Sequence, residues 1–175
     1  EEAGTQSNCT IKKESRQCSI HCFDIDRNDL QYKGPEFYTT FIIDEKSIAN
    51  GRTFNRQRTM DAIKNWLQNK SLEELYSKFE FVDEKKRQLE KLRADINESN
   101  PHLLTISENA VVFENFSSHS LWFKNDNRSC EIYCYGYEPN PRYNFKWDDC
   151  LIFETSNSDI KRLGTLINKW VFYKA

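Results

Sequence analysis

Cysteine placement constrains this chain more than any other feature of its sequence. Six cysteines lie in two groups near the ends of 175 residues, with a mirrored CxxxC spacing in each group. They are Cys9, Cys18, Cys22, Cys130, Cys134 and Cys150. An even number of cysteines in a chain of modest length is typical of a disulfide framework in a secreted protein. We therefore expect a disulfide-stapled, extracellular fold.

The spacing also suggests how the cysteines pair. If Cys18 and Cys22 share one strand, they lie about 13 Å apart at roughly 3.3 Å per residue, too far to bond to each other. Antiparallel pairing of the two cysteine strands would set Cys18 opposite Cys134 and Cys22 opposite Cys130. Cys9 would then bond to Cys150. This set of three pairings is one of 15 possible connectivities. The spacing does not match the close CxxC pairs of structural zinc, so we expect no metal site.

Five Asn-x-Ser/Thr triplets support the same compartment, because such triplets accept N-linked glycans in the secretory pathway. They begin at Asn8, Asn69, Asn97, Asn115 and Asn127. With 16 Asn and 23 Ser plus Thr in the chain, composition alone would produce about two such triplets. We expect a secreted or extracellular glycoprotein.

The first residues, Glu1-Glu2-Ala3-Gly4, are polar and precede no apolar core typical of a signal peptide, so the chain resembles a mature form from which a signal has been removed. Its apolar runs are much shorter than the roughly 18–20 residues that cross a bilayer, so we expect no membrane-spanning segment. A net charge of −2 produces no field that would attract nucleic acid, and we expect no nucleic-acid partner.

The length fits a single globular domain over residues 1–175. Short strands are expected within residues 9–23 and at 37–43, the latter between turns at Gly34-Pro35 and Asn50-Gly51. From Thr53 the apolar spacing becomes helical, and Ser71 to Glu74 has the form of a capping box. A charged helix follows from Asp83 to Ile96 and ends at Asn100-Pro101.

Alternation typical of strands returns after Pro101. Strands are expected at 103–106, 110–113, 121–123, 131–137 and 145–153. Residues 160–170 have the spacing of an amphipathic helix that Asp159 or Ser158 caps. The pattern predicts an α+β fold: a mainly antiparallel sheet from the N- and C-terminal segments, with central helices and a C-terminal helix packed on it.

Catalytic motifs are missing from the sequence. His21, His102 and His119 lie in no recognised catalytic spacing, and neither a nucleophile elbow nor a phosphate loop occurs. The carboxylates of Asp24-Ile25-Asp26 and of Asp148-Asp149 are better explained by a turn or an exposed strand end than by a bound cation. We expect a protein that is not an enzyme and needs no cofactor.

Aromatic side chains mark the candidate binding site. In the strand near Cys134, Tyr133, Tyr135 and Tyr137 project from one face, while Cys130, Ile132 and Cys134 project from the other. Tyr143 and Trp147 follow after the next turn. We predict that these five aromatics contact a partner, because tyrosine and tryptophan supply rigid contact area. In the alternative, a helix covers the tyrosine face and its residues belong to the core.

Two families resemble parts of this pattern. The last third, with a cysteine-bearing tyrosine-rich strand, a second aromatic strand and a closing helix, resembles the end of an arthropod lipocalin. The central helices do not fit a lipocalin barrel. The order of sheet, long helix, sheet and helix resembles a class I histocompatibility-like platform, but too few residues remain for its second long helix.

Three functions follow as hypotheses. The first is a module that binds another extracellular protein, with a role such as immune modulation. The second is a lipocalin-like extracellular carrier whose aromatics line a pocket for a small hydrophobic ligand. The third is a secreted hydrolase built around His102 or His119.

Overall fold

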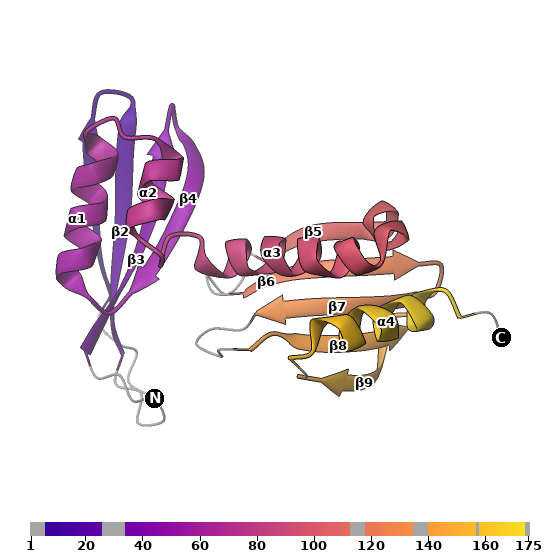
Figure 1. Cartoon of the computed structure of the whole chain (residues 1–175). Coiled ribbons are helices and arrows are strands. Elements are labelled where there is room, and N and C mark those ends of the chain that lie inside the picture. Colours follow the sequence, from indigo (N-terminus) through magenta and orange to yellow (C-terminus); the bar gives the residue numbers. More distant parts are fainter. Residues whose placement is uncertain (1–5, 26–33, 113–117, 135–139, 157, 174–175) are drawn as a thin grey trace. The chain divides into compact units, whose positions relative to one another are not determined.

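The protein contains two antiparallel sheets, each with its own helices. The computed structural model describes residues 6–25, 34–112, 118–134, 140–156 and 158–173 (Figure 1). The chain divides into two compact units, Glu1–Glu84 and Lys85–Ala175. The first holds a four-stranded sheet, sheet A, and the second a five-stranded sheet, sheet B. The mixed α+β class with a C-terminal helix is confirmed, and a single domain over the whole chain stays a prediction.

Sheet A is an antiparallel meander in which neighbouring strands follow one another in the sequence. Its strands are β1 (Gln6–Lys13), β2 (Arg16–Ile25), β3 (Gly34–Ile43) and β4 (Lys46–Thr53). The β3–β4 turn has positive φ at both central residues, 47° at Asp44 and 64° at Glu45. Such turns match the twist of the strands they connect, so they favour tight hairpins.

Two helices cover one face of sheet A, α1 (Arg56–Leu67) and α2 (Leu72–Lys78). The Asn55 side chain caps α1 by accepting a hydrogen bond from the Arg58 backbone N–H at 3.0 Å. Trp66 of α1 packs edge-on against Phe41 of β3, with ring centroids 6.1 Å apart. Cys18 lies in the same buried cluster, so alternation along β2 places this cysteine in the core.

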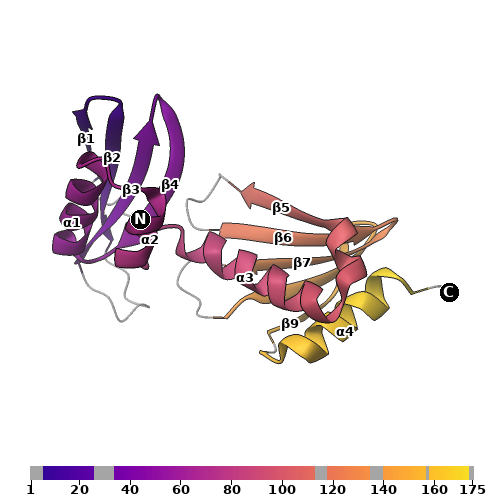
Figure 2. The same cartoon turned by 45° about the horizontal axis from the view of Figure 1, so that its top comes forward.

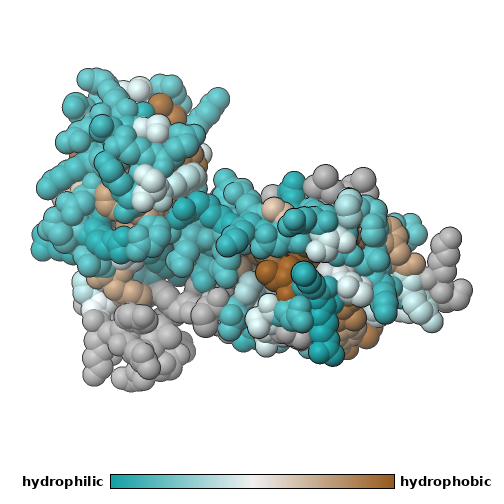
Figure 3. Space-filling view, in the orientation of Figure 1, coloured by the Kyte–Doolittle hydropathy of each residue, from teal (hydrophilic) through white to brown (hydrophobic). Residues whose placement is uncertain are grey.

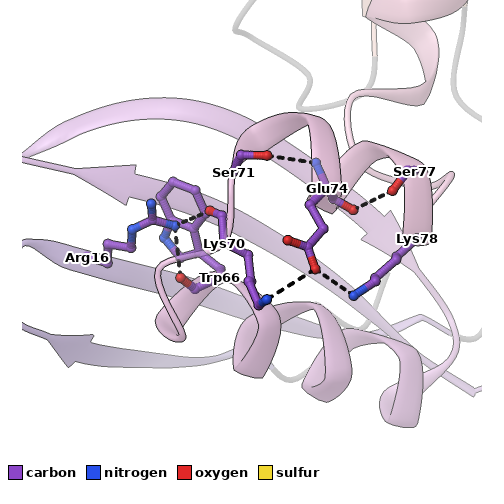
Figure 4. A network of polar contacts seen from close by, with 7 residues as sticks. All are labelled: Arg16, Trp66, Lys70, Ser71, Glu74, Ser77 and Lys78. Atoms are coloured by element: carbon purple, nitrogen blue, oxygen red, sulfur yellow. Dashed lines mark hydrogen bonds and ion pairs between the residues drawn. The ribbon is translucent and has the colours of Figure 1, made fainter.

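Arg16 joins the start of β2 to the end of α1 (Figure 4). Its guanidinium donates to the backbone carbonyls of Trp66 at 3.0 Å and Lys70 at 2.6 Å, and it lies 3.9 Å from the Trp66 ring centroid. The last carbonyls of a helix have no partner within the helix, and cations are favoured at this end. Arg16 therefore stabilises the C-terminal end of α1 with both its charge and its hydrogen bonds.

The cap that the sequence predicts for α2 forms in part (Figure 4). The Ser71 hydroxyl accepts from the Glu74 backbone N–H at 3.1 Å, as in a capping box. The Glu74 carboxylate pairs instead with Lys78 at 2.7 Å and Lys70 at 3.6 Å. Because these lysines lie one helical turn away on either side, the exposed carboxylate has two cations within reach.

The predicted turn at Asn50-Gly51 is wrong, since both residues lie inside β4. The segment after α2 packs on this strand: Gly51 pairs with Val82, and the Asp83 carboxylate accepts from the Asn50 backbone N–H at 2.8 Å. A Cβ atom on Gly51 would lie 2.7 Å from the Phe81 ring. Glycine at position 51 allows the Phe81 ring to approach the backbone of β4 closely, and it forms no turn.

Replacement of Gly51 by Ala tests this packing. We expect Gly51→Ala to lower the free energy of unfolding by about 1–3 kcal/mol, because its methyl group overlaps the buried Phe81 ring. Ser47→Ala on the same strand is the control, and at this exposed site it should change stability by less than about 0.5 kcal/mol. Urea denaturation of the three proteins measures the difference. Equal midpoints for all three would contradict the packing argument.

The second unit contains the remaining elements in the order helix, five-stranded meander, helix (Figure 2). They are α3 (Glu84–Ser99), the 3-10 helix η1 (Pro101–Ile106), β5 (Ser107–Val112), β6 (Ser118–Asn125), β7 (Arg128–Cys134), β8 (Arg142–Trp147), β9 (Cys150–Thr155) and α4 (Ile160–Val171). Asp159 caps α4, as the sequence predicts, by accepting from the Arg162 backbone N–H at 3.1 Å.

Helices α3 and α4 both pack on one face of sheet B and form one core with it (Figure 2). The sheet contributes alternate residues of its central strands, among them Phe123, Cys130 and Ile132. A Cβ atom on Gly164 of α4 would lie 2.6 Å from the Asn100 side-chain nitrogen, so glycine lets α4 approach the residue that follows α3. The charged helix that the sequence predicts is α3. It contributes only a narrow apolar seam to this core.

Two elements of the second unit differ from expectation. Residues 103–106, predicted as a strand, belong to η1, because Pro101 begins η1 and its fixed φ suits the first turn of a helix. Residues 145–153, predicted as one strand, form β8 and β9. Asp148 and Asp149 separate them with φ of 47° and 63°, which confirms the turn predicted there.

The sequence predicts one sheet built from both ends of the chain, and this is wrong. β2 is hydrogen-bonded to β1 and β3, and β7 to β6 and β8, so each cysteine strand already has a neighbour on both edges. β2 and β7 therefore do not pair, and the register that set Cys18 opposite Cys134 has no basis in the strand order. All six cysteines carry free thiols in this structure. The stapling by disulfides stays a prediction.

Candidate protein-binding surface

Tyr133 lies on the face of sheet B opposite the helices. It is half-buried in β7, between Ser120 of β6 and Arg142 of β8 in the strand register. Tyr135 and Tyr137, the other two residues of the predicted tyrosine face, lie outside the described residues. Because α3 and α4 pack on the other face, no helix of this unit covers Tyr133.

Neighbours of Tyr133 on this outer face form a polar and aromatic network. Lys146 donates to the Glu131 carboxylate at 2.7 Å, and its ammonium lies 4.5 Å from the Trp122 ring centroid. The Trp122 indole N–H donates to the Ser120 hydroxyl at 3.1 Å. These contacts hold Trp122 and Lys146 in fixed positions on the same outer face as Tyr133.

Tyr143 is not at the surface. Its side chain is 2% exposed and belongs to the core beneath α3 and α4. Burial, and to a lesser degree the neighbouring Cys130 and Cys134, raises the pKa of its hydroxyl well above the usual range. The strand register explains the position, because Tyr143 lies opposite Ile132 on the helix-facing side of the sheet. We therefore leave Tyr143 out of the candidate surface.

Trp147, in contrast, is 40% exposed at the end of β8. It lies opposite Arg128, the first residue of β7, and the Arg128 guanidinium carbon is 4.4 Å from its ring centroid. The rings of Trp170 and Tyr173, at 5.0 and 4.6 Å, complete an aromatic surround. Trp147 is thus a predicted contact residue that is exposed to solvent and has a cation beside it.

Exposed large apolar side chains are concentrated near Trp147. Among the described residues, every such side chain belongs to the stretch 147–173. They are Trp147, Leu151, Ile152, Phe153, Leu166, Phe172 and Tyr173. Figure 3 shows hydrophobic residues around α4 and β9, and others over the first unit, on a mostly hydrophilic surface. Concentration of this kind is typical of an interaction surface, whereas single exposed apolar residues are ordinary.

β9 explains why these side chains are exposed. It is the last strand of sheet B, so among the described residues nothing pairs with its outer edge. A register shift at Phe145/Lys146 interrupts alternation, and Leu151, Ile152 and Phe153 are all exposed in succession. Phe153 still stacks on Phe145 with ring centroids 4.3 Å apart. Sequence reasoning merged this strand with β8, although its unbroken apolar triplet is a signal for an unusual position.

Arg128 and Tyr173 were also missed. Arg128 follows a turn in the sequence and reads as an exposed loop residue, yet it is 8% exposed. Its burial depends on α4, which brings Trp170 from 42 residues away to within reach of the guanidinium. Local sequence patterns hold no signal for that contact.

The cysteines differ strongly in their environments. Cys9 and Cys150 are exposed, Cys22 is half-buried, and Cys18, Cys130 and Cys134 are buried. Burial raises the pKa of the Cys18 thiol to about 12 and that of Cys130 well above its usual range, with a smaller contribution from Glu131 at Cys130. Since the thiolate is the reactive form, these two buried thiols are inert near neutral pH.

Alkylation of the fully reduced, folded protein tests these environments. At pH 8, iodoacetamide should label Cys9 and Cys150 much faster than Cys18 and Cys130, because the buried pair stays protonated below its raised pKa values. Peptide mass spectrometry measures the rates, and circular dichroism verifies that reduction leaves the fold intact. Equal rates in protein shown to be folded would contradict the burial. Non-reducing peptide maps of secreted protein test the predicted Cys9–Cys150 bridge separately.

His21 and His102 pack against aromatic rings. His21 lies beside Phe23 and Tyr38, each with ring centroids 6.4 Å from its own. His102 contacts the Asn168 side-chain oxygen and packs 5.2 Å from the Phe172 ring, while the side chain of His119 lies outside the described residues. Within the described ranges no group of three His, Cys, Asp or Glu is placed to hold a metal ion. The hydrolase hypothesis stays a prediction.

One surface hollow of about 320 Å³ opens beside the hairpin turns of sheet A. Its lining is mostly polar and charged: Lys12, Ser15, Gln17, Ile42, Asp44 and Glu45. Ligand sites for hydrophobic molecules are predominantly apolar, so this hollow does not support the carrier hypothesis. That hypothesis stays a prediction.

The glycosylation triplets fall in different settings. Asn8 in β1, Asn69 between α1 and α2, and Asn127 in the β6–β7 turn are exposed. Asn97 is half-buried within α3, and its side-chain oxygen is enclosed. Asn115 lies outside the described residues.

Comparisons with protein-family models, with curated proteins and with solved structures find no match to this chain. None of the helices in its described part is long and apolar enough to cross a membrane.

Proposed function

We propose that this chain is a secreted or cell-surface glycoprotein that binds another extracellular protein through one edge of sheet B. The contact region, called the edge surface, consists of Trp147, Leu151, Ile152, Phe153 and Tyr173. The observation that supports it most is the concentration of exposed large apolar side chains in this part of the described chain. Tyr133 remains a further contact residue in this proposal, on the outer face of the same sheet.

Three physical properties favour a protein partner at the edge surface. An outer strand offers unpaired backbone donors and acceptors, with which an extended segment of another protein forms hydrogen bonds. Ile152 is 54% exposed, and covering apolar area gains about 25 cal/mol per Å². Tryptophan, tyrosine and arginine are the side chains that most often dominate binding energy at interfaces, and Arg128 lies beside Trp147 and Tyr173.

Charges at the two ends of β9 restrict what pairs with it. Asp148 and Asp149 precede the strand, and Glu154 near its end pairs with Arg142 at 3.4 Å. Charged residues of this kind oppose indiscriminate pairing of sheet edges. The edge surface therefore combines apolar attraction in its centre with polar ends, as specific interfaces do.

Site-specific photocrosslinking tests the edge surface. We expect p-benzoylphenylalanine at position 152 to form one dominant adduct in extracellular fluid from the natural source, because Ile152 lies at the centre of the exposed triplet. Mass spectrometry identifies the adduct. The matched control carries the same photoreactive residue at the exposed position Gln57 of α1.

No adduct from position 152, or the same adducts from both positions, would refute the edge surface. An adduct with twice the mass of the chain would identify a second copy as the partner instead of another protein. In the expected case, Ile152→Asp should abolish crosslinking from a photoreactive residue at the neighbouring position 151, because a buried charge at the centre of an apolar contact is costly.

Glycan mapping tests the compartment. In protein from a secretory cell we expect glycans at Asn69 and Asn127, whose side chains are exposed, and none at the half-buried Asn97. Asn69→Gln and Asn127→Gln should each shift the protein by one glycan on an electrophoretic gel. A naturally produced protein without glycan at either site would contradict the glycoprotein proposal.

A further inference from the structure

Arg128 is a buried cation for which the described chain holds no counter-charge. Its residue surface is 8% exposed, and none of the ion pairs among the described residues includes it. Its hydrogen bond to the Trp170 carbonyl is 3.5 Å long, at the outer limit for such a bond. A guanidinium carries five N–H donors, so most of its hydrogen-bonding capacity is unused.

Aromatic rings offset part of the cost of this burial. The guanidinium lies within 5.0 Å of the ring centroids of Trp147, Trp170 and Tyr173. Cation–π contacts stabilise an arginine, but they engage the charge without using its N–H donors. A carboxylate is the group whose geometry matches the unused donors, in a paired, two-bond contact.

The site is held in position before any ligand arrives. The Trp170 indole N–H donates to the Ser129 carbonyl at 3.0 Å, and the Asn125 side-chain amide donates to the Val171 carbonyl at 3.0 Å. These bonds fix the end of α4 beside the start of β7. Preorganisation of this kind lowers the entropy lost on binding.

The entrance is formed by residues of the edge surface. Trp147 and Tyr173 are 40% and 62% exposed, and both contact the guanidinium. Lys124 lies 3.9 Å from the Asp149 carboxylate and partly neutralises it, whereas the neighbouring Asp148 is exposed. Asp148 is therefore a negative charge that opposes an incoming anion.

We propose that Arg128 anchors a carboxylate of the partner protein, presented by an acidic residue between apolar residues. The guanidinium binds the carboxylate, Trp147 and Tyr173 shield the pair from water, and the flanking apolar residues lie on the edge surface. This inference rests on the proposed function and defines the chemistry of the segment that the edge surface recognises.

Short peptides test the anchor without knowledge of the partner. The probe is acetyl-Ile-Asp-Phe-amide, and its matched control is acetyl-Ile-Asn-Phe-amide. Titration into the full chain is followed by the indole N–H resonances of Trp147 and Trp170 in NMR spectra. We expect the Asp peptide to bind about ten-fold more tightly than the Asn peptide, because only the carboxylate pairs with the guanidinium. Acetyl-Ile-Asn-Phe with a free C-terminus shows whether a terminal carboxylate serves equally well.

Variants at Arg128 and Asp148, which change the charge at the site in opposite directions, complete the test. Arg128→Gln should abolish the preference for Asp over Asn, and Arg128→Lys should retain part of it, since lysine keeps the charge and loses the planar fork. Asp148→Asn should strengthen binding of the Asp peptide about two-fold, because a repelling charge is removed. Asn tolerates the positive φ of 47° at this position, so the turn is preserved. If Arg128→Gln unfolds, the Lys and Asp148 variants carry the test.

Equal binding of the Asp and Asn peptides, or no binding of either at millimolar concentration, would overturn the anchor. The edge surface is tested separately by crosslinking at position 152, which needs no carboxylate. Crosslinking at position 152 without a peptide preference would leave the protein-binding surface standing and remove Arg128 as its anchor. A preference for the Asp peptide without crosslinking at position 152 would keep Arg128 as a carboxylate anchor and refute the edge surface.

Discussion

Packing of α4 against sheet B is the constraint on which the proposed surface depends. Trp170 of α4 stands edge-on to Phe145 and Phe153, with ring centroids 6.1 and 5.5 Å apart, and so connects the helix to the last two strands. The same residue lies beside Arg128 and would form the floor of the proposed carboxylate site. A helix in another position would leave Arg128 in solvent and remove the contact of Phe153 with Trp170.

One-sided coverage gives the second unit its functional asymmetry. Both helices bury the same face of sheet B, so the other face keeps Tyr133, Trp122 and the Glu131–Lys146 pair away from the helices. The meander order then places β9 at an edge, where no further strand pairs with it within the described residues and its apolar triplet stays exposed. The proposed binding surface therefore lies at the edge of sheet B, where the strand pairing of this unit ends.

Sequence patterns predicted the local elements well and their assembly poorly. Helical spacing and caps located α1, α3 and α4, because these signals arise between residues three or four apart. Strand alternation correctly placed Cys130 and Cys134 on a buried face. The predicted pairing of the two cysteine strands was wrong, since any strand edge offers the same hydrogen-bonding groups. Of the candidate site, Trp147 was found from its type, while Tyr143 was misplaced because strand register decides which face it occupies.

The sequence by itself determined the α+β class, the positions of most helices and strands, and the burial of Cys130 and Cys134, because each depends on short-range periodicity. Tertiary structure alone decided that the strands form two sheets, that β9 lies at an edge and that Arg128 lies among three rings. These features join residues up to 45 positions apart, such as Arg128 and Tyr173. Their free energy comes from packing and hydrogen bonding between elements, which no local pattern encodes.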